Sequence, residues 1–471
     1  MVKRVVSKII DTEDEKKKKT LDLSIKEGSA TAFMSSAGET YIVPYALALN
    51  ANNLQIGFLT SFVNLFGSSS QVLGSKLSYK YQRKKIILFS VLLQSLMWLV
   101  ILGLGILVWK EIINGYAASI LVVLYCVYAI IGNISGPSWF SLMGELVPSR
   151  HRGEYFSRRN KIISLITLIA TLISAIFLDY MKGMGLVIAG FAGLFLIAFL
   201  GRFVSFLFFT KHYYPKNKAK KDSYFSFLQF IKRAPGNNFG KFVIFVGLIN
   251  LATNLAAPFF AVYMLNELHY SYVWFTLVNL SSTIFTIWSI PLWGKIGDRF
   301  GNKKLLEIGG LLIPFAPLLW IFSGNPIYLI LTAQLVAGVG WAAFNLASSN
   351  FIYDSVTPQR RGICVAYFNM INGIGVFAGA MLGGLFAQYV SVSFMNTFLL
   401  IFLISAVLRG IVVLIFTPRI KEVRQIDDAH KESVFKYIVV SAPRPFYGML
   451  REVLSVITLS NRKSAKSVTN R

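Results

Sequence analysis

Long uninterrupted runs of apolar residues recur along the chain and restrict its fold more than any other feature. Each run holds roughly 20 residues, the length that an α-helix needs to cross about 30 Å of hydrocarbon. Hydrocarbon offers no partners to loose backbone groups, and the strands of a barrel would alternate apolar with polar residues. The sequence therefore predicts twelve transmembrane helices, at residues 30–49, 54–75, 86–109, 117–143, 161–180, 185–210, 241–266, 272–293, 304–323, 326–352, 364–388 and 394–416.

The basic residues lie on one side of this predicted topology. The chain carries a formal net charge of +26, although only 14% of its residues are charged and 55% are hydrophobic. Lys and Arg cluster in alternate loops, near 76–85, 150–161 and 295–304, whereas the opposite loops hold little beyond Lys110 and Lys182. This positive-inside bias predicts a protein of the cell membrane with both termini and the central loop in the cytoplasm. A nucleic-acid partner is not expected.

The residue types that hold metals, cofactors or disulfides form no recognisable cluster in the sequence. Cys126 and Cys364 fall inside predicted helices, and the four histidines are scattered. No Gly-x-x-x-x-Gly-Lys-Ser/Thr sequence and no set of paired acids or of Ser and His residues stands out. We therefore expect no cofactor, no metal site and no catalytic residues, and hence not an enzyme.

Two pairs of loops recur at equivalent places and indicate an internal duplication. The sequence Gly-Lys-Ile-Gly-Asp-Arg-Phe-Gly-Asn-Lys-Lys at 294–304 follows the eighth apolar run, and a degraded copy at 75–85 follows the second. The second pair, at 145–153 and 354–362, follows the fourth and tenth runs. In both members an acid closes a helix, Pro blocks its continuation and Arg-Gly opens the next helix.

This duplication predicts an all-α membrane protein made of two pseudo-symmetric six-helix bundles. We expect a basic cytoplasmic segment at 1–28, which has no apolar core and cleavage site of a removable signal peptide. The first bundle would follow at 29–210, a cytoplasmic loop at 211–240, the second bundle at 241–416 and a basic cytoplasmic tail at 417–471.

Together, the loop motifs and the six-plus-six helices resemble the major facilitator superfamily of transporters over about residues 30–416. The resemblance implies parallel halves built from nested inverted repeats, and a mid-membrane cavity lined by the first, fourth, seventh and tenth helices. It also implies a conformational latch, in which Asp298 and Arg299 hold the C-terminal half to the start of the eleventh helix near Gly362. The alternative is that these loops carry only the positive-inside charge.

The residues of this predicted latch come from both pairs of loops. They are Gly294, Asp298, Arg299, Gly301, Arg361, Gly362, Glu145 and Arg152. An acid among basic residues at a helix end is attracted to cations and to a helix N-terminus, which suits Asp298. In the degraded loop Tyr79 stands at the Asp position, so that half cannot make the same ion pair.

Glu39 lies near the middle of the first predicted helix. A carboxylate at such a depth costs roughly 2.5–3.5 kcal/mol on insertion scales, so intramembrane acids usually form a pair or take part in function. Ser35, Ser36 and Thr40 lie close by on the same helix. We predict a role for Glu39 in substrate binding or proton coupling; the alternative is a structural hydrogen bond to a Tyr or Asn.

The other candidates for substrate binding or coupling are amides and indoles of the cavity-lining helices. They are Asn133, Trp139, Asn250, Asn254, Trp341 and Asn345. Asn250 and Asn254 are four residues apart and share one face of a helix, as do Trp341 and Asn345. Because amides recognise many kinds of solute, the chemical class stays open. The alternative is that they form interhelical hydrogen bonds, each worth about 0.6 kcal/mol.

Small and cationic residues inside the predicted helices bear on how these helices pack. Gly375, Gly379 and Gly383 repeat every four residues, which favours close approach of another helix. Arg202 and Arg409 occur at similar depth in the sixth and twelfth helices. Their guanidinium groups would either extend to the membrane interface or form an ion pair with an acid such as Asp179.

These features predict a secondary active transporter that moves a small organic solute by rocker-switch alternating access, driven by a proton or solute gradient. The alternative is a lipid flippase, or another lipid- or drug-handling protein, on the same scaffold. The expected partners are the solute and membrane lipid, and the expected state is a monomer. The residues leave the substrate, the direction and the coupling ion open.

Overall fold

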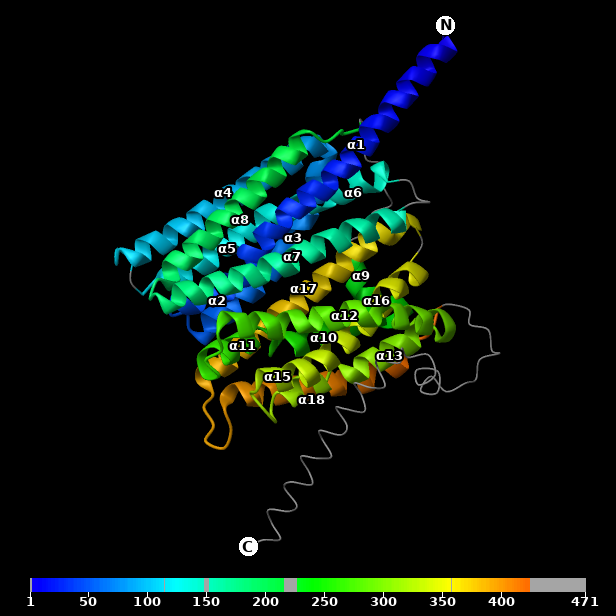
Figure 1. The fold of residues 1–471 in the computed structure, drawn as a ribbon. Helices are drawn as coiled ribbons and strands as arrows, with labels where there is room; N and C mark the ends of the chain where they lie inside the picture. Colours follow the sequence, from blue (N-terminus) through cyan, green and yellow to red (C-terminus); the bar gives the residue numbers. More distant parts are fainter. Residues whose placement is uncertain (1, 114, 148–151, 216–226, 357, 424–471) are drawn as a thin grey trace. The chain divides into compact units, whose positions relative to one another are not determined.

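Every regular element is a helix in the part of the chain that the computed structural model describes, residues 2–113, 115–147, 152–215, 227–356 and 358–423 (Figure 1). The side chains of 2–13, 79, 152–154, 157 and 358–363 also lie outside the description. The elements, with π-helical turns at η4 and η5, are α1 (Val2–Ala37), η1 (Glu39–Tyr41), α2 (Ile42–Ala48), α3 (Asn53–Lys80), α4 (Arg83–Trp109), α5 (Ala117–Ile134), α6 (Gly136–Leu146), α7 (Arg152–Gly183), α8 (Val187–Thr210), α9 (Phe227–Arg233), η3 (Ala234–Gly236), α10 (Asn238–Asn254), α11 (Ala257–Val262), η4 (Tyr263–Glu267), α12 (Tyr272–Phe300), α13 (Asn302–Leu312), α14 (Phe315–Leu319), α15 (Pro326–Leu329), η5 (Ile330–Gln334), α16 (Leu335–Ser355), α17 (Pro358–Tyr389), α18 (Thr397–Phe416) and η6 (Thr417–Arg419).

The helices have the length and composition of a multi-pass membrane protein. Among the described residues, nine helical segments are long and apolar enough to cross a membrane, which confirms the predicted all-helical membrane architecture. Three predicted crossings are not in this set. Residues 30–49 are divided among α1, η1 and α2, residues 304–323 are divided between α13 and α14, and residues 54–75 lie in α3, which is rich in Ser and Asn. The count of twelve crossings therefore stays a prediction.

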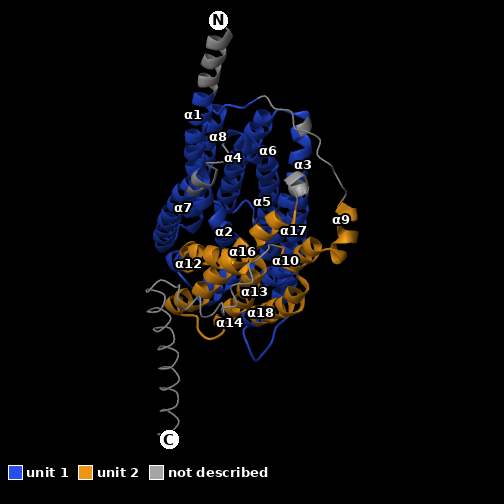
Figure 2. Ribbon diagram, turned by 90° about the vertical axis from the view of Figure 1, so that its right-hand side faces the viewer, with its two compact units in different colours: residues 1–226, 246–277, 362–401 blue, residues 227–245, 278–361, 402–471 orange. Residues whose placement is uncertain are grey.

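The chain forms two compact units, which are coloured separately in Figure 2. Unit 1 comprises Met1–Ser226, Val246–Leu277 and Gly362–Ile401, and unit 2 comprises Phe227–Phe245, Val278–Arg361 and Phe402–Arg471. The division passes through α10, α12, α17 and α18, each of which contributes one end to unit 1 and the other end to unit 2. The predicted bundles at 29–210 and 241–416 stay a prediction.

In unit 1 a bend in the first helix is fixed by packing on a buried indole. Helix α1 lies along α7 and α8, and α4 lies along α5 and α8. The Trp98 ring stacks on Phe195 with centroids 5.4 Å apart. A Cβ at Gly38 would overlap the Trp98 ring, so a glycine is required where α1 turns into η1. The bend places Glu39, the first residue of η1, beside α5.

The glycine repeat of α17 packs against the backbone of α10 within unit 1. A Cβ at Gly375, Gly379 or Gly383 would overlap the backbone carbonyl of Gly247, Leu251 or Leu255, respectively. Only a residue without a side chain allows the two backbones to approach this closely, which confirms the packing interpretation.

Unit 2 is held by a second close helix contact and by aromatic side chains. Helix α13 packs along α16, where a Cβ on Gly309 would lie 2.7 Å from the Phe344 backbone nitrogen. The Phe242 and Phe351 rings lie 4.5 Å apart, and the Trp320 and Phe402 rings 6.0 Å apart. These aromatic contacts join α10 to α16 and the end of α14 to α18.

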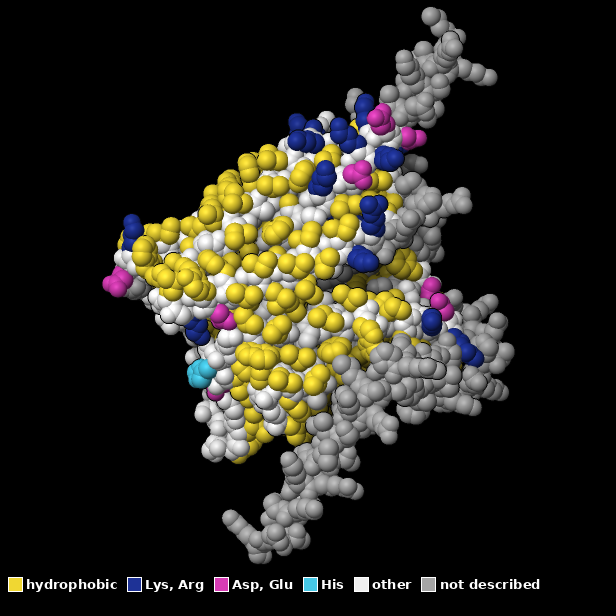
Figure 3. All heavy atoms as spheres, viewed as in Figure 1, with side chains coloured by type: hydrophobic (Ala, Val, Ile, Leu, Met, Phe, Trp, Pro, Cys, Tyr) yellow, Lys and Arg dark blue, Asp and Glu magenta, His cyan; other side chains and the backbone are white. Residues whose placement is uncertain are grey.

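The outer surface carries many large apolar side chains. Figure 3 shows hydrophobic side chains over the sides of the helices, whereas Lys and Arg lie mainly toward helix ends. Phe89, Ile173 and Leu414, on three different helices, are 68%, 62% and 68% exposed. Extensive exposed apolar surface marks contact with a membrane or another protein. In a chain of long apolar helices, lipid contact accounts for it.

Gly379→Ala should destabilise the protein, because the added methyl group meets the Leu251 carbonyl oxygen and neither backbone can yield without cost. The matched control is Gly103→Ala on α4, where an added Cβ meets nothing within 4 Å. We expect the thermal midpoint in detergent to fall for Gly379→Ala and to stay or rise for Gly103→Ala, since Ala exceeds Gly in helix propensity by about 0.8–1 kcal/mol. Equal midpoints for the two variants would contradict the close approach of α17 and α10.

Candidate functional site

A polar cavity of about 320 Å³ lies inside unit 1. Its wall is formed by α1, α4, α6, α7 and α8. The charged residues of the wall are Glu27, Arg159 and Arg202, and Trp139 contributes an indole ring. Charged side chains inside an apolar helix bundle are expensive, so their concentration around one cavity marks it as a candidate functional site.

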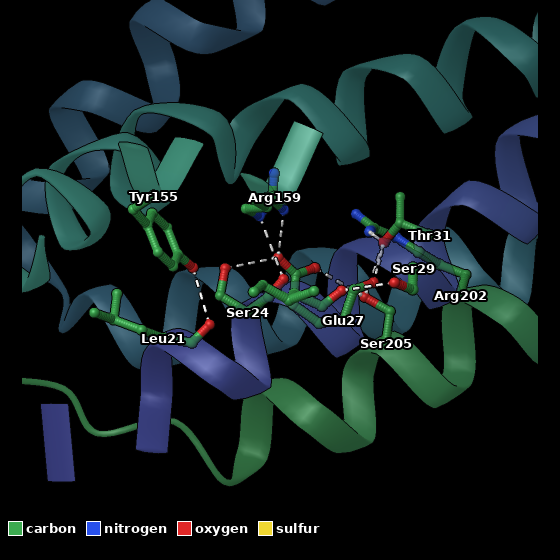
Figure 4. A network of polar contacts seen from close by, with 10 residues as sticks. Leu21, Ser24, Glu27, Ser29, Thr31, Tyr155, Arg159, Arg202 and Ser205 are labelled. Carbon is green, nitrogen blue, oxygen red and sulfur yellow. Dashed lines mark hydrogen bonds and ion pairs between the residues drawn. The ribbon is translucent and has the colours of Figure 1, made fainter. Parts of the chain in front are cut away.

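The best-defined interaction of the cavity is an ion pair between α1 and α7, drawn in Figure 4. Arg159 Nη2 lies 2.9 Å from Glu27 Oε1, and the Arg159 Nε donates to the Ser24 backbone carbonyl at 3.3 Å. The Glu27 residue is only 3% exposed. A Cβ at Gly28 would lie 2.7 Å from Arg159 Nη2, so a glycine here leaves room for the guanidinium group.

A chain of hydroxyl groups connects the second cation of the cavity to the same carboxylate. Arg202 Nη1 donates to Thr31 Oγ1 at 3.2 Å, and Thr31 Oγ1 donates to Ser205 Oγ at 3.1 Å. Ser205 Oγ in turn donates to Glu27 Oε2 at 3.5 Å. Figure 4 shows these side chains of α1 and α8 directed toward one another. Two cations and one acid are thus coupled within a single network.

The position of Arg202 corrects the sequence-based expectation. Neither Arg202, 8% exposed, nor Arg409, 3% exposed, extends to a membrane interface. The predicted ion pair with Asp179 is also wrong, because Asp179 accepts hydrogen bonds from the backbone N–H groups of Tyr272 and Val273 at 2.7 and 2.8 Å. Asp179 therefore stabilises the first turn of α12, where a helix leaves its N–H groups unpaired.

Trp139 is the predicted binding residue that lines the cavity. Its ring lies 5.0 Å from the Arg159 guanidinium carbon, a cation–π contact that holds the cation against α6. Asn133 lies on α5, where its Oδ1 accepts a hydrogen bond from Gln71 Nε2 at 3.0 Å. This bond joins α5 to α3, so Asn133 makes the interhelical contact that was the alternative to binding.

Glu39 is half-buried and is held by two hydroxyl groups. Its Oε1 accepts from the Tyr128 hydroxyl at 2.7 Å, and its Oε2 accepts from Ser35 Oγ at 2.5 Å. Ser35 also lines the cavity, so it connects Glu39 to the cavity wall. The structural hydrogen bond to a Tyr is present, and the role of Glu39 in binding or coupling stays a prediction.

The remaining predicted binding residues do not line this cavity. Asn250 Nδ2 donates to the Val246 carbonyl and Asn254 Nδ2 to the Asn250 carbonyl, so both amides bond to the turn before them. In unit 2 the Trp341 ring packs edge-on against Phe344 with centroids 5.5 Å apart, and Asn345 is exposed.

The predicted latch residues of α12 lie at the end of that helix in unit 2. Asp298 is exposed, and the half-buried Arg299 lies over the Phe300 ring at 5.7 Å. Gly301 adopts φ 87° and ψ 164°, a conformation essentially restricted to glycine, and it separates α12 from α13. A Cβ at Gly294 would meet nothing within 4 Å. The side chains of Arg152 and Arg361, and the surroundings of Gly362, lie outside the described residues.

Each half contains an equivalent contact between the start of its third predicted helix and the acid that closes its fourth. In unit 1 Arg83 Nη2 lies 2.8 Å from Glu145 Oε2. In unit 2 Asn302 Nδ2 donates to Asp354 Oδ2 at 2.7 Å, and Asn302 is 1% exposed. Aligned on their Lys-Lys ends, the two repeated loops pair Arg83 with Asn302. The internal duplication is therefore visible in the contacts of each unit.

Sequence reasoning missed Glu27, Arg159 and Asn302 as members of these contacts. Glu27 fell in the segment predicted to precede the first membrane helix, whereas α1 continues from Val2 to Ala37 without a break. A signal was present, because Ser24, Glu27, Thr31 and Ser35 follow one another at spacings of three or four residues and so share one face of a helix.

A family model and curated relatives match the chain. The model described as Major Facilitator Superfamily matches residues 28–249 and 242–460. An uncharacterised MFS-type transporter of Methanocaldococcus jannaschii is 26% identical over 385 residues, which cover 79% of this chain and 93% of that protein. The vacuolar basic amino acid transporter 1 of Saccharomyces cerevisiae is 33% identical over 98 residues, which cover 21% of this chain and 17% of the yeast protein.

Solved structures share the fold. The nucleoside transporter NupG aligns with a TM-score of 0.64 at 16% identity, over 85% of this chain and 100% of that one. A bacterial homologue of the iron transporter ferroportin, in an inward-facing state, aligns with a TM-score of 0.64 at 15% identity, over 85% and 98%. At these identities the similarity shows the fold alone.

Glu27→Gln should destabilise the protein by about 3–5 kcal/mol, because it leaves the buried Arg159 without its acid. The matched control is Glu145→Gln, which removes a more exposed ion pair worth about 1 kcal/mol or less. We expect the thermal midpoint in detergent to fall much further for Glu27→Gln. Similar losses in the two variants would show that the α1–α7 ion pair is not the more strongly buried interaction.

Proposed function

The chain belongs to the Major Facilitator Superfamily, and on this premise we propose that it is a secondary active transporter that moves a small organic solute across the cytoplasmic membrane. Membrane transport itself follows from the family and from the transporters that share the fold. The solute, the driving gradient and rocker-switch alternating access are the parts that we propose.

The observation that carries this proposal is the polar cavity of unit 1. A cavity of about 320 Å³ lined by Glu27, Arg159 and Arg202 is unusual among helices that are otherwise apolar. Its volume lies at the lower end of the range for small-molecule pockets, roughly 300–1,000 Å³. Polar groups at membrane depth are retained where they bind substrates or ions, which supports a solute pathway on this side of the chain.

The internal duplication supports alternating access by two similar halves. Arg83 with Glu145, and Asn302 with Asp354, are equivalent contacts that tie the third and fourth predicted helices together at the same end of each half. Transporters built from such repeats work by rocking one bundle against the other. The predicted latch would then control which side of the membrane is open.

The general test is uptake into proteoliposomes. Nucleosides, short peptides, amino acids, sugars and carboxylic acids would each be offered with and without an imposed pH gradient. Uptake of one class above protein-free liposomes supports the proposal, and a dependence on the gradient identifies proton coupling. Failure of every class to enter would contradict transport of a small organic solute.

We predict that Glu39→Gln abolishes gradient-driven uptake while solute exchange is partly retained. Gln can still accept the hydrogen bond from Tyr128, but it cannot gain or release a proton. The matched control is Glu307→Gln, which lies on α13 and pairs with Lys304 at 3.1 Å. Unaltered pH-driven uptake in the Glu39 variant would remove this residue from the coupling mechanism.

We predict that Asp298→Asn weakens the cytoplasmic latch and favours the inward-open state. The reporter is Asn345→Cys, at an exposed position of α16, in a chain whose native cysteines are replaced by Cys126→Ser and Cys364→Ser. Its labelling by a membrane-impermeant maleimide from the cytoplasmic side should become faster when Asp298→Asn is added. Glu307→Gln serves again as the control, and an unchanged labelling rate would count against the latch.

A further inference from the structure

The cavity of unit 1 contains a buried cation with an unused hydrogen-bond donor. Arg202 is 8% exposed, and its Nη1 donates to Thr31 Oγ1 at 3.2 Å. Its Nε has no hydrogen-bond partner among the residues that the structure describes. A guanidinium group presents five N–H donors in a planar fork, and burial of such a charge is costly unless it is paired.

The acids near Arg202 are already engaged by other groups. Glu27 forms its ion pair with Arg159, and Glu39 accepts from Tyr128 and Ser35. Within the described part of the chain, no carboxylate lies within 4.0 Å of Arg202. Two guanidinium groups and one carboxylate therefore line the cavity, which leaves it electropositive.

The equivalent residue of the second half is satisfied in a different way. Arg409 Nε donates to Ser405 Oγ at 3.1 Å, and its Nη1 donates to the Ile313 carbonyl at 3.3 Å. Burial of an arginine at this depth can thus be achieved with protein partners alone. The free Nε of Arg202 is a local property of the cavity rather than a consequence of the helix position.

The rest of the wall combines hydroxyl groups with apolar side chains. Ser35 and Ser135 line it, as do Ile87, Val91, Ile163 and Phe209. We infer that Arg202 binds the carboxylate of a small organic anion whose apolar body packs against these side chains, and that such anions are the transported solutes. The second part rests on the proposed function, whereas the first part concerns binding alone.

Binding is tested on the purified full-length protein in detergent. Butyrate and benzoate are compared with butyramide and benzamide, which have nearly the same shape without the charge. A ligand that binds the folded state raises its thermal midpoint. We expect both carboxylates to raise the midpoint and both amides to leave it unchanged, and calorimetric titration then gives each Kd. Equal effects of acids and amides would overturn the inference.

The decisive variants change the two equivalent arginines in the same way. Arg202→Lys keeps the charge but loses the planar fork, and we expect carboxylate binding to weaken severalfold. Arg202→Gln removes the charge, and we expect at least tenfold weaker binding. Arg409→Lys should leave the Kd unchanged. Because Arg202→Lys retains a cation, it covers the case in which Arg202→Gln does not fold. Wild-type affinity in a folded Arg202 variant would overturn the inference.

Two further arms separate the sources of an anion. Inorganic phosphate that stabilises the protein as strongly as benzoate would overturn the assignment to an organic anion. The titration is repeated in nanodiscs of phosphatidylcholine with and without phosphatidylglycerol, and loss of benzoate binding in the anionic lipid would assign the site to a lipid headgroup and overturn it too. Uptake of a neutral solute without carboxylate binding would refute this inference and leave the proposed function standing, whereas carboxylate binding without uptake of any solute would refute only transport.

Discussion

The lack of hydrogen-bond partners in hydrocarbon is the constraint on which the rest of this structure depends. Polar side chains on apolar helices must find partners within the protein. Asn250 and Asn254 bond to carbonyl groups of the preceding turn, and Asn133 bonds to Gln71 of a neighbouring helix. The same constraint makes backbone packing valuable, as where Gly379 allows α17 to approach the Leu251 carbonyl of α10.

Under that constraint the charged network of unit 1 acquires its importance. One face of α1 presents Ser24, Glu27, Thr31 and Ser35, and α7 and α8 supply the two arginines that meet it. The ion pair and the hydroxyl chain satisfy most of these groups. Arg202, which keeps an unused donor, lines the cavity, and this makes the network a binding site in our interpretation as well as a structural contact.

The two halves keep a common framework and differ in chemistry. The contact between the third and fourth predicted helices is an ion pair in unit 1 and an amide–carboxylate hydrogen bond in unit 2. Arg202 and Arg409 occupy similar depths in the sequence pattern, yet protein groups engage Arg409 more fully. Duplication thus provides a repeated scaffold on which one half has acquired a charged cavity.

The sequence alone determined the helical membrane architecture, the loop duplication, the family and the packing role of the glycine repeat, because apolar runs, charge bias and residue spacing are local properties of the chain. It also marked Glu39 as an intramembrane acid. It did not identify Glu27 with Arg159 as a pair, and it placed Arg202 incorrectly. The contact of Glu27 with Arg159 spans 132 residues of sequence, and that of Thr31 with Arg202 spans 171. Only the tertiary structure decides which polar faces meet, because that depends on how α1, α7 and α8 pack around a common cavity.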